Sequence, residues 1–251
     1  MSTDTTTVRV ERAEPVTTLV LDRPAALNAI TSEMLTELDL ALEAIAEDDG
    51  TRVVVITGEG RAFSAGVDLK ALGGRSLEGG MVGDVLDVPA RRVIERIRRL
   101  PQIVIAAVNG HCFTGALELA LGCDLIVAAE EAVFGDTHAK WGLRPTWGMS
   151  QRLPHLVGPA RARQLSYTAR TFTGVEAGAW GLAASVVPRA DLDATVAELA
   201  ATIAANSPGA LAAYKDLYRV ADERDLPDGL AYEAAARYPI ADTEERIAGF
   251  R

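Results

Sequence analysis

Residues 104–124, VIAAVNGHCFTGALELALGCD, constrain the fold of this chain more than any other segment. The apolar start predicts a buried strand, and the Asn-Gly pair after Val108 predicts a turn. A helix-compatible segment then begins near Gly115 and carries Glu118 in its first turn. The first N–H groups of a helix have no partner within it, so they can bind a negatively charged oxygen. The stretch therefore predicts an anion site beside a carboxylate that could transfer protons.

Composition indicates a globular protein and argues against several kinds of partner. With 251 residues the chain can form one large domain with a substantial core. Its 49% hydrophobic and 24% charged residues are typical of globular proteins. A net charge of −10 argues against nucleic acid or an anionic membrane as the main partner.

The two cysteines and the N-terminal sequence bear on the compartment. Cys112 and Cys123 are too few for a disulfide framework and lack the spacing of a metal site. The polar start MSTDTTTVRVERAEP has no apolar core of a signal peptide, and no apolar run reaches transmembrane length. We therefore expect a cytoplasmic protein.

Strand and helix patterns alternate up to about residue 188, and only helical patterns follow. The predicted strands are residues 6–10, 16–21, 53–57, 103–108, 125–129, 132–135 and 184–187. The predicted helices include residues 33–47, capped by Thr31 or Ser32, and 89–100, a basic amphipathic segment whose polar face we expect to be solvated. This order predicts an α/β core over residues 1–190 and a helical C-terminal region over residues 191–251.

Two glycine-rich segments are predicted to be irregular. Residues 58–70, GEGRAFSAGVDLK, form a loop in which Gly66 would let the backbone approach a ligand closely. Residues 73–87 are rich in glycine without a clear period, which predicts a mobile flap or lid.

The 58–70 loop and the turn at residues 110–118 have the same form. Each follows a buried strand and exposes backbone N–H groups beside glycine. Two such donors that converge on one point would make an oxyanion hole, which stabilises an enolate or a tetrahedral oxyanion. The alternative is that both are ordinary glycine turns.

Three polar side chains are candidates for function. Glu118, in the apolar run LELALG, is either a partner of the helix dipole or an acid/base with a raised pKa. His138 lies in a loop with aromatic residues, where it either transfers protons or is structural. For Asp68 we favour a role in fixing its loop by accepting backbone hydrogen bonds.

Four motifs, in order along residues 16–187, carry a family resemblance. They are LDRPAALNAIT, ITGEGRAFSAGVDLK, AAVNGHCFTGALELALGCD and FGDTHAKWGLRPTWGMSQRLP. The chain resembles the crotonase superfamily, the enoyl-CoA hydratase/isomerase family. The resemblance implies a spiral of ββα repeats with a helical C-terminal extension. It also implies homotrimers or homohexamers that assemble through the C-terminal helices.

The resemblance further implies an acyl-CoA thioester as substrate. The backbone N–H groups of Val67 and Gly115 would hold the thioester oxygen. Coenzyme A would enter as part of the substrate, and no metal or other cofactor is expected. The implied substrate contacts are Ala65, Gly66, Asp68, Leu69 and Lys70 along the thioester and pantetheine, Ala25, Ala26 and Leu27 at the adenine end, and Trp141.

The resemblance is least complete at the acid/base pair. Family hydratases use two glutamates; the first aligns with Glu118, and the second falls at His138. A neutral imidazole can act as acid or base near pH 7. A glutamate and a histidine, however, do not hold one water molecule between them as two carboxylates do. The family's isomerases usually keep an acid at this position, so a simple isomerase is not favoured either.

Three functions follow from this pair. The leading hypothesis is an enoyl-CoA hydratase-like enzyme that adds water to a 2-enoyl-CoA. A second is carbon–carbon hydrolysis of a β-diketone, in which relatives pair a histidine with an aspartate; the corresponding place is near Trp147, and no aspartate follows Asp136 before Asp191. A third is a protein that binds acyl-CoA with little catalysis.

Overall fold

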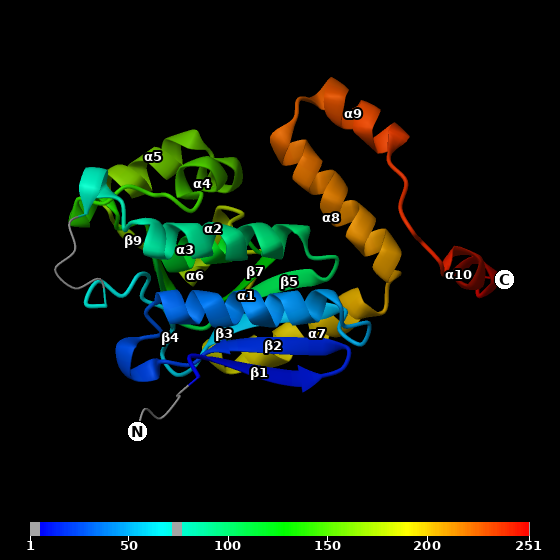
Figure 1. Cartoon of the computed structure of the whole chain (residues 1–251), viewed down its shortest axis with the longest axis horizontal. Helices are drawn as coiled ribbons and strands as arrows, with labels where there is room; N and C mark the ends of the chain where they lie inside the picture. Colours follow the sequence, from blue (N-terminus) through cyan, green and yellow to red (C-terminus); the bar gives the residue numbers. More distant parts are fainter. Residues whose placement is uncertain (1–5, 72–76, 251) are drawn as a thin grey trace.

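Two β-sheets organise the computed structural model, which describes residues 6–71 and 77–250 (Figure 1). The larger sheet has six strands in the order β1-β2-β3-β5-β7-β10, and all neighbours are parallel except β1 and β2. Its strands are β1 (Val8–Ala13), β2 (Val16–Leu21), β3 (Val53–Gly58), β5 (Ile103–Val108), β7 (Leu125–Ala129) and β10 (Ser185–Val187).

The first hairpin differs from its prediction. The register pairs Val8 with Leu21 and Ala13 with Val16, so the chain reverses at Glu14 and Pro15. The polar residues after Val10, which we expected to form the turn, instead continue an edge strand that is mostly exposed. Polar side chains on an edge strand can face water without breaking the backbone pairing.

The second sheet is smaller, and of its four strands only the one over residues 132–135 was predicted. It has the order β4-β6-β8-β9, with strands β4 (Ala62–Ser64), β6 (His111–Phe113), β8 (Val133–Gly135) and β9 (Thr171–Thr173). The sequence predicted loops for residues 58–70 and for those after Asn109, and this was wrong where β4 and β6 lie. Strands of three residues are too short to show an alternating pattern.

The two sheets alternate along the chain to give the expected ββα repeats. The strand pairs β3–β4 and β5–β6 are followed by α2 (Asp84–Arg99) and α3 (Gly115–Ala120). The pair β7–β8 is followed by α4 (Met149–Val157) and α5 (Pro159–Thr168), and α6 (Gly174–Ala179) follows β9. The short strands β4, β6 and β8 therefore each follow a strand of the larger sheet and precede a helix, whereas β9 follows α5.

Helix α1 (Ser32–Ala46) agrees closely with its prediction. The hydroxyl of Thr31 accepts a hydrogen bond from the N–H of Met34, at 3.2 Å, and so caps the helix. The predicted apolar face is buried, as the periodicity required: Met34, Leu35, Leu38, Leu42 and Ile45.

Helix α2 begins earlier than predicted. It starts at Asp84, although we expected its start at Pro89 and a lid over residues 73–87. The buried residues Leu86, Ala90 and Val93 lie at helical spacing, so the apolar face continues on the N-terminal side of the proline. Residues 78–80 form a short 3-10 turn, and residues 73–76 of the expected lid lie outside the described residues.

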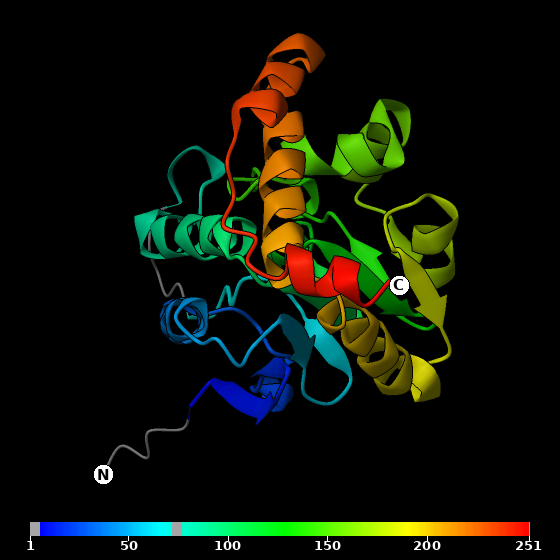
Figure 2. The ribbon, with the colours of Figure 1, turned by 90° about the vertical axis from the view of Figure 1, so that its right-hand side faces the viewer.

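The C-terminal region is helical, as predicted. It contains α7 (Leu192–Ala204), α8 (Pro208–Glu223), α9 (Leu226–Ala235) and α10 (Thr243–Ala248). Helix α7 packs against the sheet, and α8 runs beside α2, whereas Figures 1 and 2 show α9 and α10 reaching away from the sheets. None of the described helices is both long and apolar enough to span a membrane.

A buried lysine fixes α8 to the core. The ammonium group of Lys215 donates to the carbonyl of Gln102, at 2.8 Å, and to the carboxylate of Asp124, at 2.6 Å. The same carboxylate oxygen of Asp124 accepts the N–H of Val104, at 2.7 Å. The lysine therefore joins α8 to both ends of the chain segment that contains β5 and α3.

We predict that Lys215→Met lowers the free energy of unfolding by about 2 kcal/mol, because it removes the two hydrogen bonds that the buried ammonium group makes to Gln102 and Asp124. Urea denaturation measures the effect. In the double variant Lys215→Met/Asp124→Asn no charge is left unpaired, so its loss should be smaller than that of the single variant. A single variant as stable as the wild type would contradict the role of Lys215.

Candidate active site

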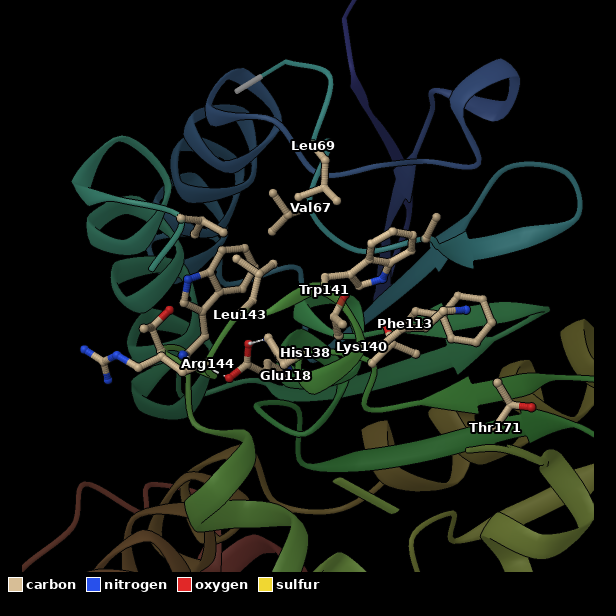
Figure 3. A pocket seen from close by; sticks show the side chains of 16 residues that line it. Val67, Leu69, Phe113, Glu118, His138, Lys140, Trp141, Leu143, Arg144 and Thr171 are labelled. Carbon is tan, nitrogen blue, oxygen red and sulfur yellow. Dashed lines mark hydrogen bonds and ion pairs between the residues drawn. The ribbon is translucent and has the colours of Figure 1, made fainter. Parts of the chain in front are cut away.

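A cavity of about 310 Å³ lies where the turn into α3, the loop after β4 and the loop after β8 meet (Figure 3). Six of the predicted site residues line it: Ala65, Val67, Leu69, Glu118, His138 and Trp141. Figure 3 shows Val67 and Leu69 on one side, with Glu118 and His138 across from them. The fold thus brings both catalytic candidates together with one of the two predicted oxyanion donors.

The other predicted contacts are not among the residues that line the cavity. The N–H of Ala65 donates to the carbonyl of Leu27, at 2.9 Å, so Leu27 lies next to the 65–70 loop. The Asp68 carboxylate accepts the N–H groups of Lys70 and Ala71, both at 3.1 Å, and binds Arg23 at 3.0 Å. The prediction that Asp68 fixes its own loop is therefore confirmed.

The two glycine turns touch one another at Gly66. Its φ is +87°, and a Cβ there would lie 2.2 Å from Oγ1 of Thr114 and 2.6 Å from the carbonyl oxygen of Phe113. A side chain would collide with both, so only glycine allows this close approach. Thr114 itself has φ of +46°, which is strained for a β-branched residue and costs about 1–3 kcal/mol.

The strained turn at Thr114 presents the N–H of Gly115 at the start of α3. Neither this N–H nor that of Val67 donates a hydrogen bond to any group in residues 6–71 or 77–250. Gly115 is also packed tightly, because a Cβ on it would lie 2.5 Å from Cζ3 of Trp147. Val67 lines the cavity, whereas Gly115 lies behind Trp147 and is not among the lining residues.

Glu118 is buried, with 1% of its surface exposed, and is held by backbone. Its Oε1 accepts the N–H groups of Trp147 and Met149, both at 2.9 Å. Its Oε2 lies 3.5 Å from Nε2 of His138. One carboxylate oxygen is therefore fixed by the loop before α4, and the other faces the histidine.

His138 has a second carboxylate partner that the sequence analysis missed. Its Nδ1 lies 2.7 Å from Oδ1 of Asp136, and the hydroxyl of Ser166 donates to Oδ2 of Asp136, at 2.6 Å. The aspartate lies two residues before the histidine, whereas we looked only for one further along the loop. The spacing Asp-Thr-His was a usable signal, because residues i and i+2 of an extended chain lie on the same side; Ser166 left no such signal.

The surroundings of His138 set its charge. Burial lowers its pKa, but its hydrogen bonds with Asp136 and Glu118 outweigh burial and raise the pKa to about 9. At pH 7 the ring is therefore an imidazolium, a state that the sequence analysis did not consider. Burial also raises the pKa of Asp136, yet the hydrogen bonds from His138 and Ser166 hold it below its ordinary value.

The cysteines take no part in this site. Both are free thiols, and burial raises the pKa of Cys112 and of Cys123 well above the ordinary value, which makes them unreactive. In the part of the chain that the structure describes, no three His, Cys, Asp or Glu side chains are grouped so as to hold a metal ion.

Comparison with known proteins places the chain in a family. Residues 11–251 match the family model described as enoyl-CoA hydratase/isomerase. The chain belongs to the enoyl-CoA hydratase/isomerase family. Among relatives in this family, the putative enoyl-CoA hydratase/isomerase YngF of Bacillus subtilis is 38% identical over 239 residues, which cover 95% of this chain and 91% of YngF.

Solved structures of the family have the same fold. An enoyl-CoA hydratase from Bacillus anthracis superposes with a TM-score of 0.88 at 36% identity, over 97% of this chain and 94% of that one. A monofunctional enoyl-CoA isomerase from M. smegmatis superposes with a TM-score of 0.77 at 32% identity, over 93% of this chain and 100% of that one. The predicted crotonase fold is therefore confirmed. Because hydratases and isomerases share it, the acid/base residues must decide the reaction.

We predict that NMR titration of the His138 ring gives a pKa near 9, and that Asp136→Asn lowers it, because a neutral amide no longer stabilises the imidazolium. The pKa in the folded protein lies above the unfolded value of 6.5. The interaction should therefore stabilise the fold fully below pH 6.5 and lose its effect as the pH rises to about 9. A ring that titrates near 6.5 in the folded wild type would contradict this electrostatic arrangement.

Proposed function

We propose that this protein is an enoyl-CoA hydratase-like enzyme that adds water across the 2,3 double bond of an enoyl-CoA. The observation that carries the proposal is a buried carboxylate–imidazolium pair, Glu118 and His138, in a cavity that also holds an unpaired backbone donor. The names of its relatives, several of them enoyl-CoA hydratases, support the same reaction.

The thioester oxygen binds the N–H groups of Val67 and Gly115. These donors have no other partner among the described residues, and their loops are locked together at Gly66. They stabilise the negative charge that develops on this oxygen when the enolate forms. The pantetheine follows the 65–70 loop past Leu69 and Lys70, towards residues 25–27 at the adenine end. This chemistry needs no metal or redox cofactor.

Addition of water then proceeds through the two side chains. Glu118 takes a proton from a water molecule as the water oxygen bonds to C3, and the electrons of the double bond move to the thioester oxygen. The imidazolium of His138 donates its Nε2 proton to C2, and the carbonyl reforms. The proton on Glu118 then returns to Nε2 of His138 across their 3.5 Å separation.

The proton count explains how a histidine can stand in for a glutamate. A carboxylate beside a protonated carboxyl holds one transferable proton, and so does a carboxylate beside an imidazolium. The second pair is available near neutral pH only if the histidine stays protonated. Asp136 ensures this, because it accepts the Nδ1 proton and leaves the Nε2 proton directed towards Glu118.

A second candidate reaction is carbon–carbon hydrolysis of a β-diketone. The observation that favours it is the contact between His138 and Asp136, since the aspartate that we sought near Trp147 is supplied from the other side of the histidine. In this reaction the histidine would activate water to attack a ketone rather than protonate an enolate. We rank it second because the raised pKa of His138 leaves little free base at neutral pH.

A direct assay separates these possibilities. Purified protein is incubated with 2-enoyl-CoA thioesters of several chain lengths, and the loss of the conjugated thioester absorbance is followed. Turnover supports hydration. Cleavage of a cyclic β-diketone without coenzyme A would support the second candidate, and tight acyl-CoA binding without either reaction would indicate a binding protein.

We predict that Glu118→Gln lowers kcat for hydration by roughly 10²–10⁴-fold, because the amide keeps the backbone hydrogen bonds but cannot accept the proton of water. Affinity for a saturated acyl-CoA, measured by calorimetry, should change little. Glu130→Gln, an exposed change outside the cavity, is the matched control. Full activity in the Glu118 variant would remove this residue from the mechanism.

We also propose that the protein forms a homotrimer or homohexamer through its C-terminal helices. Large apolar side chains of α9 and α10 and their flanks are exposed: Leu226, Leu230, Ile247 and Phe250. An apolar surface of this kind usually marks an interface. Light scattering should give three or six subunits, and a truncation after residue 223 should give a smaller assembly; a monomeric full-length chain would refute the proposal.

A further inference from the structure

A buried carboxylate outside the Asp136–His138–Glu118 chain contacts the same cavity wall. Asp87, on α2, is 2% exposed. Its Oδ1 accepts a hydrogen bond from the hydroxyl of Thr146, at 2.6 Å, and one from the indole Nε1 of Trp147, at 2.8 Å. No lysine, arginine or histidine of the described residues forms an ion pair with it. Both hydrogen bonds that its side chain accepts therefore come from the loop at residues 146 and 147.

Both the backbone and the ring of Trp147 are held by neighbouring groups. Its N–H donates to Glu118, its carbonyl accepts a guanidinium N–H of Arg152 at 2.9 Å, and its ring lies against Gly115. Only 4% of its surface is exposed, although it lines the cavity. The indole is thus a wall that lies against an oxyanion donor and beside the catalytic carboxylate.

The cavity that this wall bounds is small. Its volume of about 310 Å³ is at the lower end of the ~300–1,000 Å³ usual for ligand sites. Leu143 and Val82 line it together with Trp147, so the surface offered to a ligand there is mainly apolar. The same space must hold the thioester carbon and C2–C3, which leaves little room for a long acyl chain.

We propose that Trp147, held in place by Asp87 and Thr146, is the specificity-determining residue that restricts this enzyme to short acyl chains. The proposal rests on the proposed acyl-CoA function and names the substrate class within it.

The hydrogen bond that the indole of Trp147 donates to Asp87 makes the wall rigid. If the indole rotated to admit a longer chain, it would lose its bond to Asp87. The buried carboxylate would then keep one donor, Thr146, and would be left partly unsatisfied, which is unfavourable. A tryptophan without this bond could move aside, so Asp87 acts on specificity through Trp147 and is a positioning residue.

Calorimetric binding of butanoyl-, octanoyl- and dodecanoyl-CoA tests the proposal. These saturated thioesters cannot be hydrated, so chain-length preference is measured even if the proposed hydration reaction fails. For the wild type we expect that chain length beyond butanoyl adds no affinity. In Trp147→Leu each methylene that becomes buried should increase affinity by roughly fourfold, so octanoyl-CoA should gain tenfold or more relative to butanoyl-CoA.

Two further variants distinguish a specific wall from a general effect on the cavity. Asp87→Ala should also relax the chain-length limit, whereas Asp87→Asn, which keeps an oxygen acceptor, should keep most of it. Trp141→Ala removes the other tryptophan of the cavity, which is 58% exposed. It should change affinity for all chain lengths by the same factor.

The proposal is overturned if the wild type binds dodecanoyl-CoA more tightly than butanoyl-CoA. It is also overturned if folded Trp147→Leu keeps the wild-type ratio of affinities. Circular dichroism and thermal melting establish folding; if Trp147→Leu does not fold, the ratio in Asp87→Ala decides, and an unchanged ratio there counts against the proposal.

Discussion

The positions of the groups around the cavity depend on the two hydrogen bonds that the loop before α4 donates to Glu118. Two N–H groups of the loop before α4 hold Oε1, so the carboxylate has one orientation and its Oε2 faces His138. The same loop brings Trp147 against Gly115, and Gly115 follows the strained Thr114. Glu118, His138 and Gly115 therefore share one rigid support, and a shift in the loop would disturb all three.

Charge balance within this support explains the departure from a pair of glutamates. An isolated buried histidine would lose its proton, because burial disfavours its charged form. Here two carboxylates flank the ring, and Ser166 satisfies the outer oxygen of Asp136. The result is a buried group that remains cationic near neutral pH and can donate from Nε2. The histidine thus stays cationic only because Asp136 and Glu118 both accept hydrogen bonds from its ring.

Periodicity predicted much of the fold. The apolar face of α1, its cap at Thr31 and the buried strands of the larger sheet all follow from local pattern. Strands β4 and β6 of the second sheet were not predicted in this way, because they have three residues each and pair with neighbours far away in sequence. The start of α2 was misplaced because Pro89 was read as a helix start, although the helix passes through it.

The sequence by itself determined which residues are available: a glycine where two turns touch, a carboxylate in an apolar run, and a histidine two residues after an aspartate. Local chemistry and motif spacing carry that information. Only the tertiary structure decided the protonation of His138 and the fixed position of Trp147. Both depend on Asp136, Ser166 and Asp87, whose side chains reach the site from different elements. A pKa and a cavity wall are set by everything that surrounds a group in space, and a linear sequence does not list those neighbours.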